Sequence, residues 1–253
     1  MNFRAGIVFL REFARSLVVV KWMTRHFFTA SKKMPLSNNP AEKPFSDVVQ
    51  LGAVITKTDG GFHVGFLYKF GSSAPEMLHL AWHHILRRDV PSDRYSWVQC
   101  GFSEDIRDVI VPALAGVAQD QKIPYSPIFQ GIYFDQGVLT YSRNQAGDGL
   151  TCATFMMALM QTLGCPLFNP DEWPVRDDDS TWHEGVIAAL EAEPTVTQQH
   201  TDAIRATPKG ARFRPQEVAG SFSELGAPIP FSQAEALGRE VATEVCAVSQ
   251  TTT

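Results

Sequence analysis

The chain has 253 residues, of which 44% are hydrophobic, 11% aromatic and 19% charged. This is enough apolar material for one sizeable core and too much for an intrinsically disordered chain. The formal net charge of −5 is uneven, because residues 1–33 carry seven Lys or Arg and one acid, and residues 34–253 carry the remaining −11. The acidic charge of residues 34–253 argues against a nucleic-acid-binding protein, since phosphate contacts need clustered Lys and Arg.

Residues 1–44 are interpreted as a basic N-terminal segment that ends in a Pro-rich linker, "PLSNNPAEKP". The apolar stretch over 6–23 is too short and too charged to cross a bilayer, because Arg11, Glu12, Arg15 and Lys21 interrupt it. Two interpretations stay open: a basic amphipathic helix in weak contact with an anionic membrane surface, or a disordered segment. The sequence from Met34, "MPLSNNPAEKP", is also typical of a chain start.

Short β-branched and alternating runs follow, with Gly-rich turns between them. They predict strands at 47–56, 62–70, 77–84 and 95–100. The turn "GSS" makes the second and third of these strands an antiparallel hairpin.

Helical periodicity dominates the rest of the chain. It predicts helices at 103–119 (with Pro112 inside), 152–163, 179–191, 196–206, 215–224 and 232–247, and a small hairpin or loop at 130–142. Strands first and helices afterwards indicate an α+β fold, with a small antiparallel sheet packed on a Cys-bearing helix. We expect a catalytic core over 45–170 and a helical extension over 171–253 packed on it.

The stretch "GDGLTCATFMMALMQTLGC" places Cys152 at the expected start of an apolar helix. A helix N-terminus favours a thiolate, because its N–H groups lack partners and the helix dipole is positive there. Gly147 and Gly149 allow the backbone to approach closely, and Thr151 or Asp148 is expected to cap the helix. Cys152 is therefore a candidate nucleophile, and a small buried hydrophobe is the alternative.

Four of the seven histidines lie in or beside the predicted hairpin. If the hairpin turns about Ser72, the numbers of facing residues sum to 144, and His63 and His79 are diagonal neighbours, roughly 7–8 Å apart at Cα. An odd sum would place these two on opposite faces, and a sum of 147 would place His84 opposite His63. If the two rings meet, His79 can act as the polar partner of His63. Such a partner holds an imidazole in the tautomer that takes a proton from a thiol.

The sequence "FHVGFLYKFGSSAPEMLHLAWHH", followed later by "LTCATFMMAL", resembles the circularly permuted papain-like hydrolases. This NlpC-type group includes the lecithin:retinol acyltransferase-like enzymes, and the resemblance covers about residues 47–165. It implies that Cys152 is the nucleophile, His63 the general base and His79 the orienting polar group. The order His before Cys reverses that of papain, as a permutation implies. Ala153 and Thr154 differ from the Asn-Cys-Glu-His sequence of the acyltransferase branch.

The resemblance implies a cysteine-dependent hydrolase or acyltransferase that acts on an amide bond through an acyl-enzyme on Cys152. No cofactor and no metal are expected. The substrate class stays open between peptide, isopeptide, peptidoglycan stem and lipid amide. The alternative is a non-catalytic binding or regulatory module of the same fold, in which the histidines are structural.

A zinc site made by His63, His79, Cys152 and a water molecule is a rival for the same residues. The sequence contains no CxxC pair that would support it. His83 and His84 are expected at a solvated strand end.

Two further polar stretches are given structural interpretations. The acidic run at 177–179, with His183, reads as a helix N-terminus rather than a metal cluster, since acids favour that end of a helix. Lys209, Arg212 and Arg214 lie close together and are expected in a solvated turn before a helix, with a substrate carboxylate as the alternative ligand.

The four cysteines show no CxxC spacing. Cys100, Cys165 and Cys246 are expected to be inert core residues. A disulfide framework is not expected, so a reducing compartment, the cytoplasm, is the predicted location.

Overall fold

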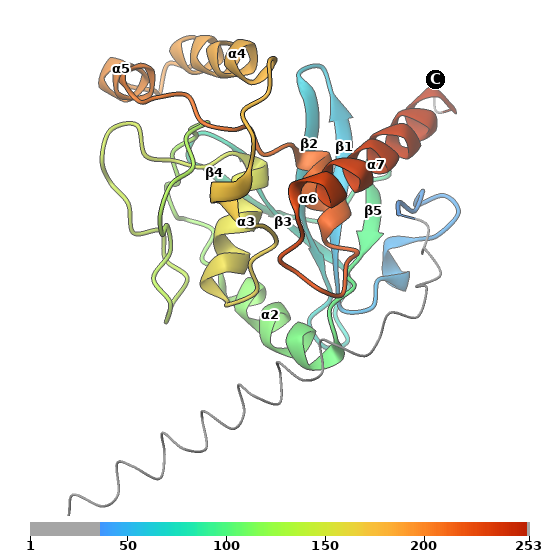
Figure 1. Ribbon diagram of the computed structural model, residues 1–253. Coiled ribbons are helices and arrows are strands. Elements are labelled where there is room, and N and C mark those ends of the chain that lie inside the picture. The colour runs from blue at the N-terminus through green and yellow to red at the C-terminus, as the bar shows by residue number, and fades with distance from the viewer. Residues whose placement is uncertain (1–35, 252–253) are drawn as a thin grey trace, which may run out of the picture. The chain divides into compact units, whose positions relative to one another are not determined.

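A five-stranded antiparallel sheet forms the centre of the computed structural model, which describes residues 36–251 (Figure 1). The strand order is β4-β3-β2-β1-β5. The strands are β1 (Leu51–Thr58), β2 (Gly61–Tyr68), β3 (Glu76–Trp82), β4 (Ile85–Asp89) and β5 (Ser96–Gln99). The described residues all belong to one compact unit. The expectations for residues 1–33 lie outside the described residues.

The helices lie after the sheet in the chain. They are α2 (Glu104–Gly116), α3 (Cys152–Thr162), α4 (Asp179–Glu191), α5 (Gln198–Ala206), α6 (Pro215–Ser221) and α7 (Phe231–Thr251). Two short 3₁₀ helices are η1 (Phe45–Asp47) and η2 (Pro170–Glu172). The predicted α+β class is therefore confirmed. None of the helices in the described part of the chain has the length and hydrophobicity needed to cross a bilayer.

The predicted elements and the observed ones differ mainly at strand boundaries. Every predicted helix is present, and α4 has the predicted ends. The sequence failed to predict β4, because its residues "ILRRD" are mostly charged and follow directly on β3. Charged side chains are typical of an edge strand, which has a partner on one side only.

The register of the β2–β3 hairpin is the one predicted from a turn about Ser72. Phe66 faces Leu78 and Leu67 faces Met77. This register places His63 and His79 on the same face of the sheet, because side chains alternate along a strand.

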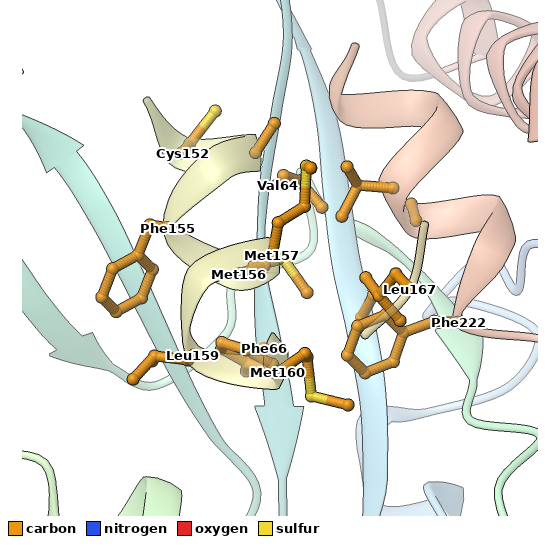
Figure 2. Close-up of a cluster of buried hydrophobic side chains, with 14 of the residues drawn as sticks. Val64, Phe66, Cys152, Phe155, Met156, Met157, Leu159, Met160, Leu167 and Phe222 are labelled. Carbon is orange, nitrogen blue, oxygen red and sulfur yellow. The ribbon is translucent and has the colours of Figure 1, made fainter. Parts of the chain in front are cut away.

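Helix α3 lies in the core and is buried on all sides. All nine residues from Cys152 to Met160 are buried, as expected for a helix that is apolar around its circumference. Figure 2 shows α3 lying against β2, with Phe66 of the sheet among the side chains that pack on it. The ring centroid of Phe66 lies 6.2 Å from that of Phe155 and 5.7 Å from that of Phe222. The sheet thereby fixes the position of the helix that carries Cys152.

The C-terminal helices form two groups. Helices α6 and α7 pack on each other and against β1, while α4 and α5 contact each other and lie at the end of the structure away from α2 (Figure 1). Residues of α4 and of the segment before α6 line the cavity described below.

Candidate active site

The hairpin brings the rings of His63 and His79 into contact. Nε2 of His63 lies 2.7 Å from Nδ1 of His79, and the ring centroids are 4.9 Å apart at an interplanar angle of 77°. The other ring nitrogen of His79, Nε2, lies 3.0 Å from Oδ2 of Asp89 at the end of β4. A hydrogen-bonded chain therefore runs from Asp89 through His79 to His63.

Asp89 determines where the protons lie in this chain. A carboxylate can only accept, so Nε2 of a neutral His79 carries its proton and Nδ1 accepts. Nε2–H of His63 therefore donates to His79, which leaves the lone pair of His63 Nδ1 for another proton. Burial, together with the nearby His79 and Arg94, lowers the pKa of His63 from 6.5 to about 3. The His63 ring is thus neutral at pH 7, the form in which an imidazole acts as a base.

Gly65 makes room for the two histidines to meet. It follows His63 on the same face of β2 and lies beside His79. A Cβ at this position would be 2.7 Å from Cβ of His79, closer than real Cβ atoms approach, and a tight 3.0 Å from the carbonyl oxygen of Leu78. Any side chain here would displace His79, so a glycine is needed between the strands.

Cys152 is the first residue of α3, and a threonine caps the helix in front of it. Oγ1 of Thr151 accepts from the Thr154 N–H at 3.2 Å, while Oγ1 of Thr154 accepts from the Thr151 N–H at 2.7 Å. This reciprocal pair is a capping box with threonine at both positions. Cys152 is 4% exposed and is labelled at the start of the helix among the buried side chains of Figure 2.

The backbone next to His63 reaches the sulfur of Cys152. N–H groups of an antiparallel strand point alternately to its two neighbours, and that of Val64 points away from β1. The β2–β3 ladder ends at the pair Phe66–Leu78. The Val64 N–H instead favours the ionised form of the Cys152 thiol, so the sulfur lies near the residue of β2 that follows His63.

Burial raises the pKa of the Cys152 thiol, against the N–H groups of Val64 and Ala153 and the charge of Arg212. The helix N-terminus alone predicts the opposite direction; desolvation outweighs it here. The resting pair is therefore a neutral thiol and a neutral imidazole. No hydrogen bond joins the sulfur to the His63 ring within residues 36–251, and contacts of this kind commonly tighten only when substrate binds.

Tyr125 is a site residue that the sequence did not reveal. Its hydroxyl lies beside the sulfur and the backbone N–H of Cys152, and burial and Cys152 both raise the pKa of the phenol. Leu150 pairs with Tyr125 in a parallel bridge. The bridge requires Gly149, since a Cβ there would lie 2.5 Å from the carbonyl oxygen of Pro124. The glycine before the helix thus brings the tyrosine to the cysteine.

Two histidines hold the backbone of Tyr125. Its N–H donates to Nδ1 of His83 at 3.2 Å, and Nε2 of His200 donates to its carbonyl oxygen at 2.9 Å. The Gly147 N–H donates to Nδ1 of His200, which fixes the proton of that ring on Nε2. The prediction of a solvated strand end is wrong for His83, which is 5% exposed because the Tyr125 segment covers it. His84 lies in the turn between β3 and β4.

A cavity of about 610 Å³ brings the predicted site residues together. His63, His79 and Cys152 all line it, and His84 does not. Tyr125 forms another part of its wall. The volume falls within the range typical of small-molecule and peptide side-chain sites.

The structure offers no support for a metal site at these residues. Nowhere in the described chain do three His, Cys, Asp or Glu side chains lie close enough to hold a metal ion. In the acidic run, Asp179 begins α4 and its Oδ2 accepts from the N–H groups of Arg176 and Arg212. His183 is buried inside α4, and burial lowers its pKa.

The other cysteines lie away from the cavity lining. Cys100 is buried, and burial raises its thiol pKa to about 12. Cys165 and Cys246 are half-buried, so they are less enclosed than the sequence predicted. All four cysteines are unbridged.

The basic cluster near residue 210 separates in the structure. Nζ of Lys209 binds Glu184 at 2.5 Å in an exposed position, as predicted. Arg214 is half-buried, and its Nη2 binds Asp178 at 2.6 Å. Arg212 lines the cavity instead.

Comparison with protein-family models, with curated proteins and with solved structures gives no match for this chain. The function of the site is therefore inferred from its own geometry. Asp89 and Tyr125 are the two site residues that sequence reasoning missed. The charged end of "ILRRD" was a weak signal for the first, whereas Tyr125 reaches Cys152 only through tertiary structure.

Proposed function

We propose that this protein is a thiol-dependent hydrolase or acyltransferase of the circularly permuted papain-like type, acting on an amide bond. The supporting observation is the chain of hydrogen bonds from Asp89 through His79 to His63, which opens into the same cavity as a cysteine at a helix start. A base, the group that orients the base, and a nucleophile are the three parts that thiol catalysis needs.

In the proposed reaction the Cys152 sulfur attacks the carbonyl carbon while Nδ1 of His63 takes the thiol proton. The imidazolium that forms is stabilised through His79 by Asp89. The backbone N–H of Cys152 and the hydroxyl of Tyr125 lie beside the sulfur, where they can donate to the developing oxyanion. His63 then gives its proton to the leaving amine, and a thioester remains on Cys152.

Water or an amine resolves the thioester, and the choice decides between hydrolysis and acyl transfer. Because thiol and imidazole are both neutral at rest, proton transfer accompanies attack rather than preceding it. The free state of all four cysteines is consistent with the proposed cytoplasmic location, where a catalytic thiol stays reduced.

Alkylation by iodoacetamide tests this proposal, with each cysteine followed separately by mass spectrometry at pH 7. Cys246, which is half-buried on α7, is the internal control. We expect Cys152 to react at least about tenfold faster than Cys246, since general-base assistance is typically worth more than that. His63→Asn should remove the advantage, whereas His84→Asn, outside the cavity, should keep it.

Equal alkylation of Cys152 and Cys246, or a Cys152 rate that does not change in His63→Asn, would reject the proposal. The alternative, a binding module with structural histidines, would then be the better description.

A further inference from the structure

The cavity is basic, although the chain as a whole is acidic. Four cationic side chains line it, and the lining residues include no Asp or Glu in the part of the chain that the structure describes: Lys57, Arg87, Arg94 and Arg212. The chain as a whole carries a net charge of −5. A lining with four cations and no acid is therefore the opposite of the average charge of the chain. Such a concentration of one sign inside a concavity attracts ligands of the opposite sign.

These four cations have no carboxylate partner among residues 36–251. Neighbouring cations outside the cavity behave differently: Arg176 pairs with Glu217, Arg205 with Glu191 and Lys209 with Glu184. The acids that act on the charge of Arg212 are Asp178 and Asp179. Asp178 binds the Arg214 side chain, and Oδ2 of Asp179 accepts from the backbone N–H groups of Arg176 and Arg212. The cavity cations are therefore left for a ligand.

Arg212 has the geometry of an anion-binding residue. Its guanidinium lies over the indole of Trp182, 4.5 Å from the ring centroid, so one face is covered and the N–H edges stay open. Its Nε is buried without a hydrogen-bond partner in the described structure, as are those of Arg176 and Arg214, so an anion would meet the terminal Nη groups. A Cβ at Gly61 would lie 3.5 Å from Nη2 of Arg212. The guanidinium of Arg212 therefore reaches the start of β2, two residues from His63.

The remaining wall of the cavity is largely aromatic. Phe62, Trp82, Tyr125, Trp182 and Phe213 line it. The rings of Trp82 and Tyr125 pack at 4.5 Å between centroids. An apolar or planar group fits against these rings, while the cationic side favours an anion.

We propose that the substrate of this site is anionic: an acyl compound whose carboxylate or phosphate pairs with the Arg212 guanidinium while its carbonyl faces Cys152. Lys57, Arg87 and Arg94 add charge that draws the anion in. This inference rests on the proposed thiol function for its chemistry, but anion binding itself does not require a reactive thiol.

Two alkylating reagents of almost equal shape test the charge preference. In both, the Cys152 sulfur displaces iodide and forms a thioether; iodoacetate is anionic and iodoacetamide neutral. We expect Arg212→Gln to lower the ratio of the iodoacetate rate to the iodoacetamide rate at Cys152 by about tenfold or more, the usual loss with a charge-assisted hydrogen bond. Arg205→Gln, outside the cavity, should leave the ratio unchanged. An equal ratio in wild type and Arg212→Gln would overturn the proposal.

Calorimetric titration of Cys152→Ala with succinate and with inorganic phosphate distinguishes the two anions without any thiol chemistry. The proposal is supported if succinate or phosphate binds Cys152→Ala and no longer binds Cys152→Ala/Arg212→Gln. The anion that binds more tightly identifies the class, carboxylate or phosphate. Binding of neither, or binding that survives the loss of Arg212, would overturn it. Failure of the proposed function is separate, because it shows as slow iodoacetamide labelling of Cys152 whatever the anions do.

Discussion

Asp89, His79 and His63 are single residues on three different strands, and each depends on the next for its proton. Asp89 accepts from His79, so His79 can only accept from His63, and His63 Nδ1 keeps its lone pair. A side chain that can both donate and accept at position 89 would permit the reversed arrangement. In that arrangement His63 Nδ1 carries a proton and cannot act as a base.

Asp89→Asn tests this dependence with little change in shape. The amide can donate to His79, so we expect alkylation of Cys152 by iodoacetamide to slow by about tenfold or more, as in other sites where a wrong tautomer is allowed. The measurement is the Cys152 rate relative to that of Cys246 in the same molecule. Asp93→Asn, exposed in the loop before β5, is the control and should keep the wild-type rate. An unchanged rate in Asp89→Asn would show that the carboxylate has no part in orienting the pair.

Among single residues, the sequence predicted those site residues that a local sequence pattern identifies. Alternation along two strands, with a turn about Ser72, predicted the pairing of His63 with His79, although other registers stayed open until the structure showed a sum of 144. The Gly-rich turn marked Cys152 as a helix start. Tyr125 could not be found in this way, because it reaches the cavity from a segment that carries no periodic signal. Arg212 was named from the sequence as a possible carboxylate ligand, but only as the alternative to a solvated turn. The direction of the Cys152 pKa was also wrong, because a sequence shows the helix N-terminus but not the degree of burial.

Among the elements, α3 connects the stability of the fold to the site. Its first turn carries Cys152, and its capping box fixes where the helix begins. The helices were predictable because their apolar periodicity and end signals agree. Strand β4 was not, because an edge strand with three charged residues resembles a loop in sequence, and only its pairing with β3 makes it a strand.

Thr151→Ala should destabilise the protein by about 1 kcal/mol, the usual cost of a lost N-cap. The hydroxyl that accepts from the Thr154 N–H disappears, and the start of α3 is expected to fray at Cys152. Urea unfolding at pH 7 measures the change. Thr151→Ser keeps the hydroxyl and should stay close to wild type. Equal stability of the Ala and Ser variants would show that the cap contributes nothing.

For the whole molecule, burial of neutral histidines makes folding stability depend on pH. The pKa of His63 is lowered to about 3 and that of His83 to about 4, both mainly by burial. Above pH 6.5 these rings are neutral in both the folded and the unfolded chain, so they cause no pH dependence. Below pH 6.5 the unfolded chain takes up protons that the folded chain does not, so stability falls as the pH falls towards 3.

We expect the free energy of unfolding to fall on acidification by up to about 1.4 kcal/mol per pH unit for each such histidine. His63→Asn removes one of these groups, so its stability should fall less steeply than that of wild type between pH 6.5 and pH 4. Urea titrations at several pH values give both slopes. Parallel slopes would mean that His63 is not held neutral by the fold.

The whole fold is also what completes the cavity. Trp182 and Phe213 come from the C-terminal helical part, while His63 and Cys152 come from the sheet and α3. The sequence predicted the two parts separately, and it could not predict that their junction would be basic, since Arg212 and Arg94 are far apart in the chain.

Acylation by p-nitrophenyl acetate tests the central claim most directly. If Cys152 attacks with His63 as its base, the full chain releases a burst of p-nitrophenolate, and mass spectrometry finds one acetyl group on Cys152 as a hydroxylamine-labile thioester. Cys152→Ala should lose the burst, and His63→Asn should slow it strongly. A wild-type protein that releases no burst and carries no acetyl group on Cys152 would contradict the account.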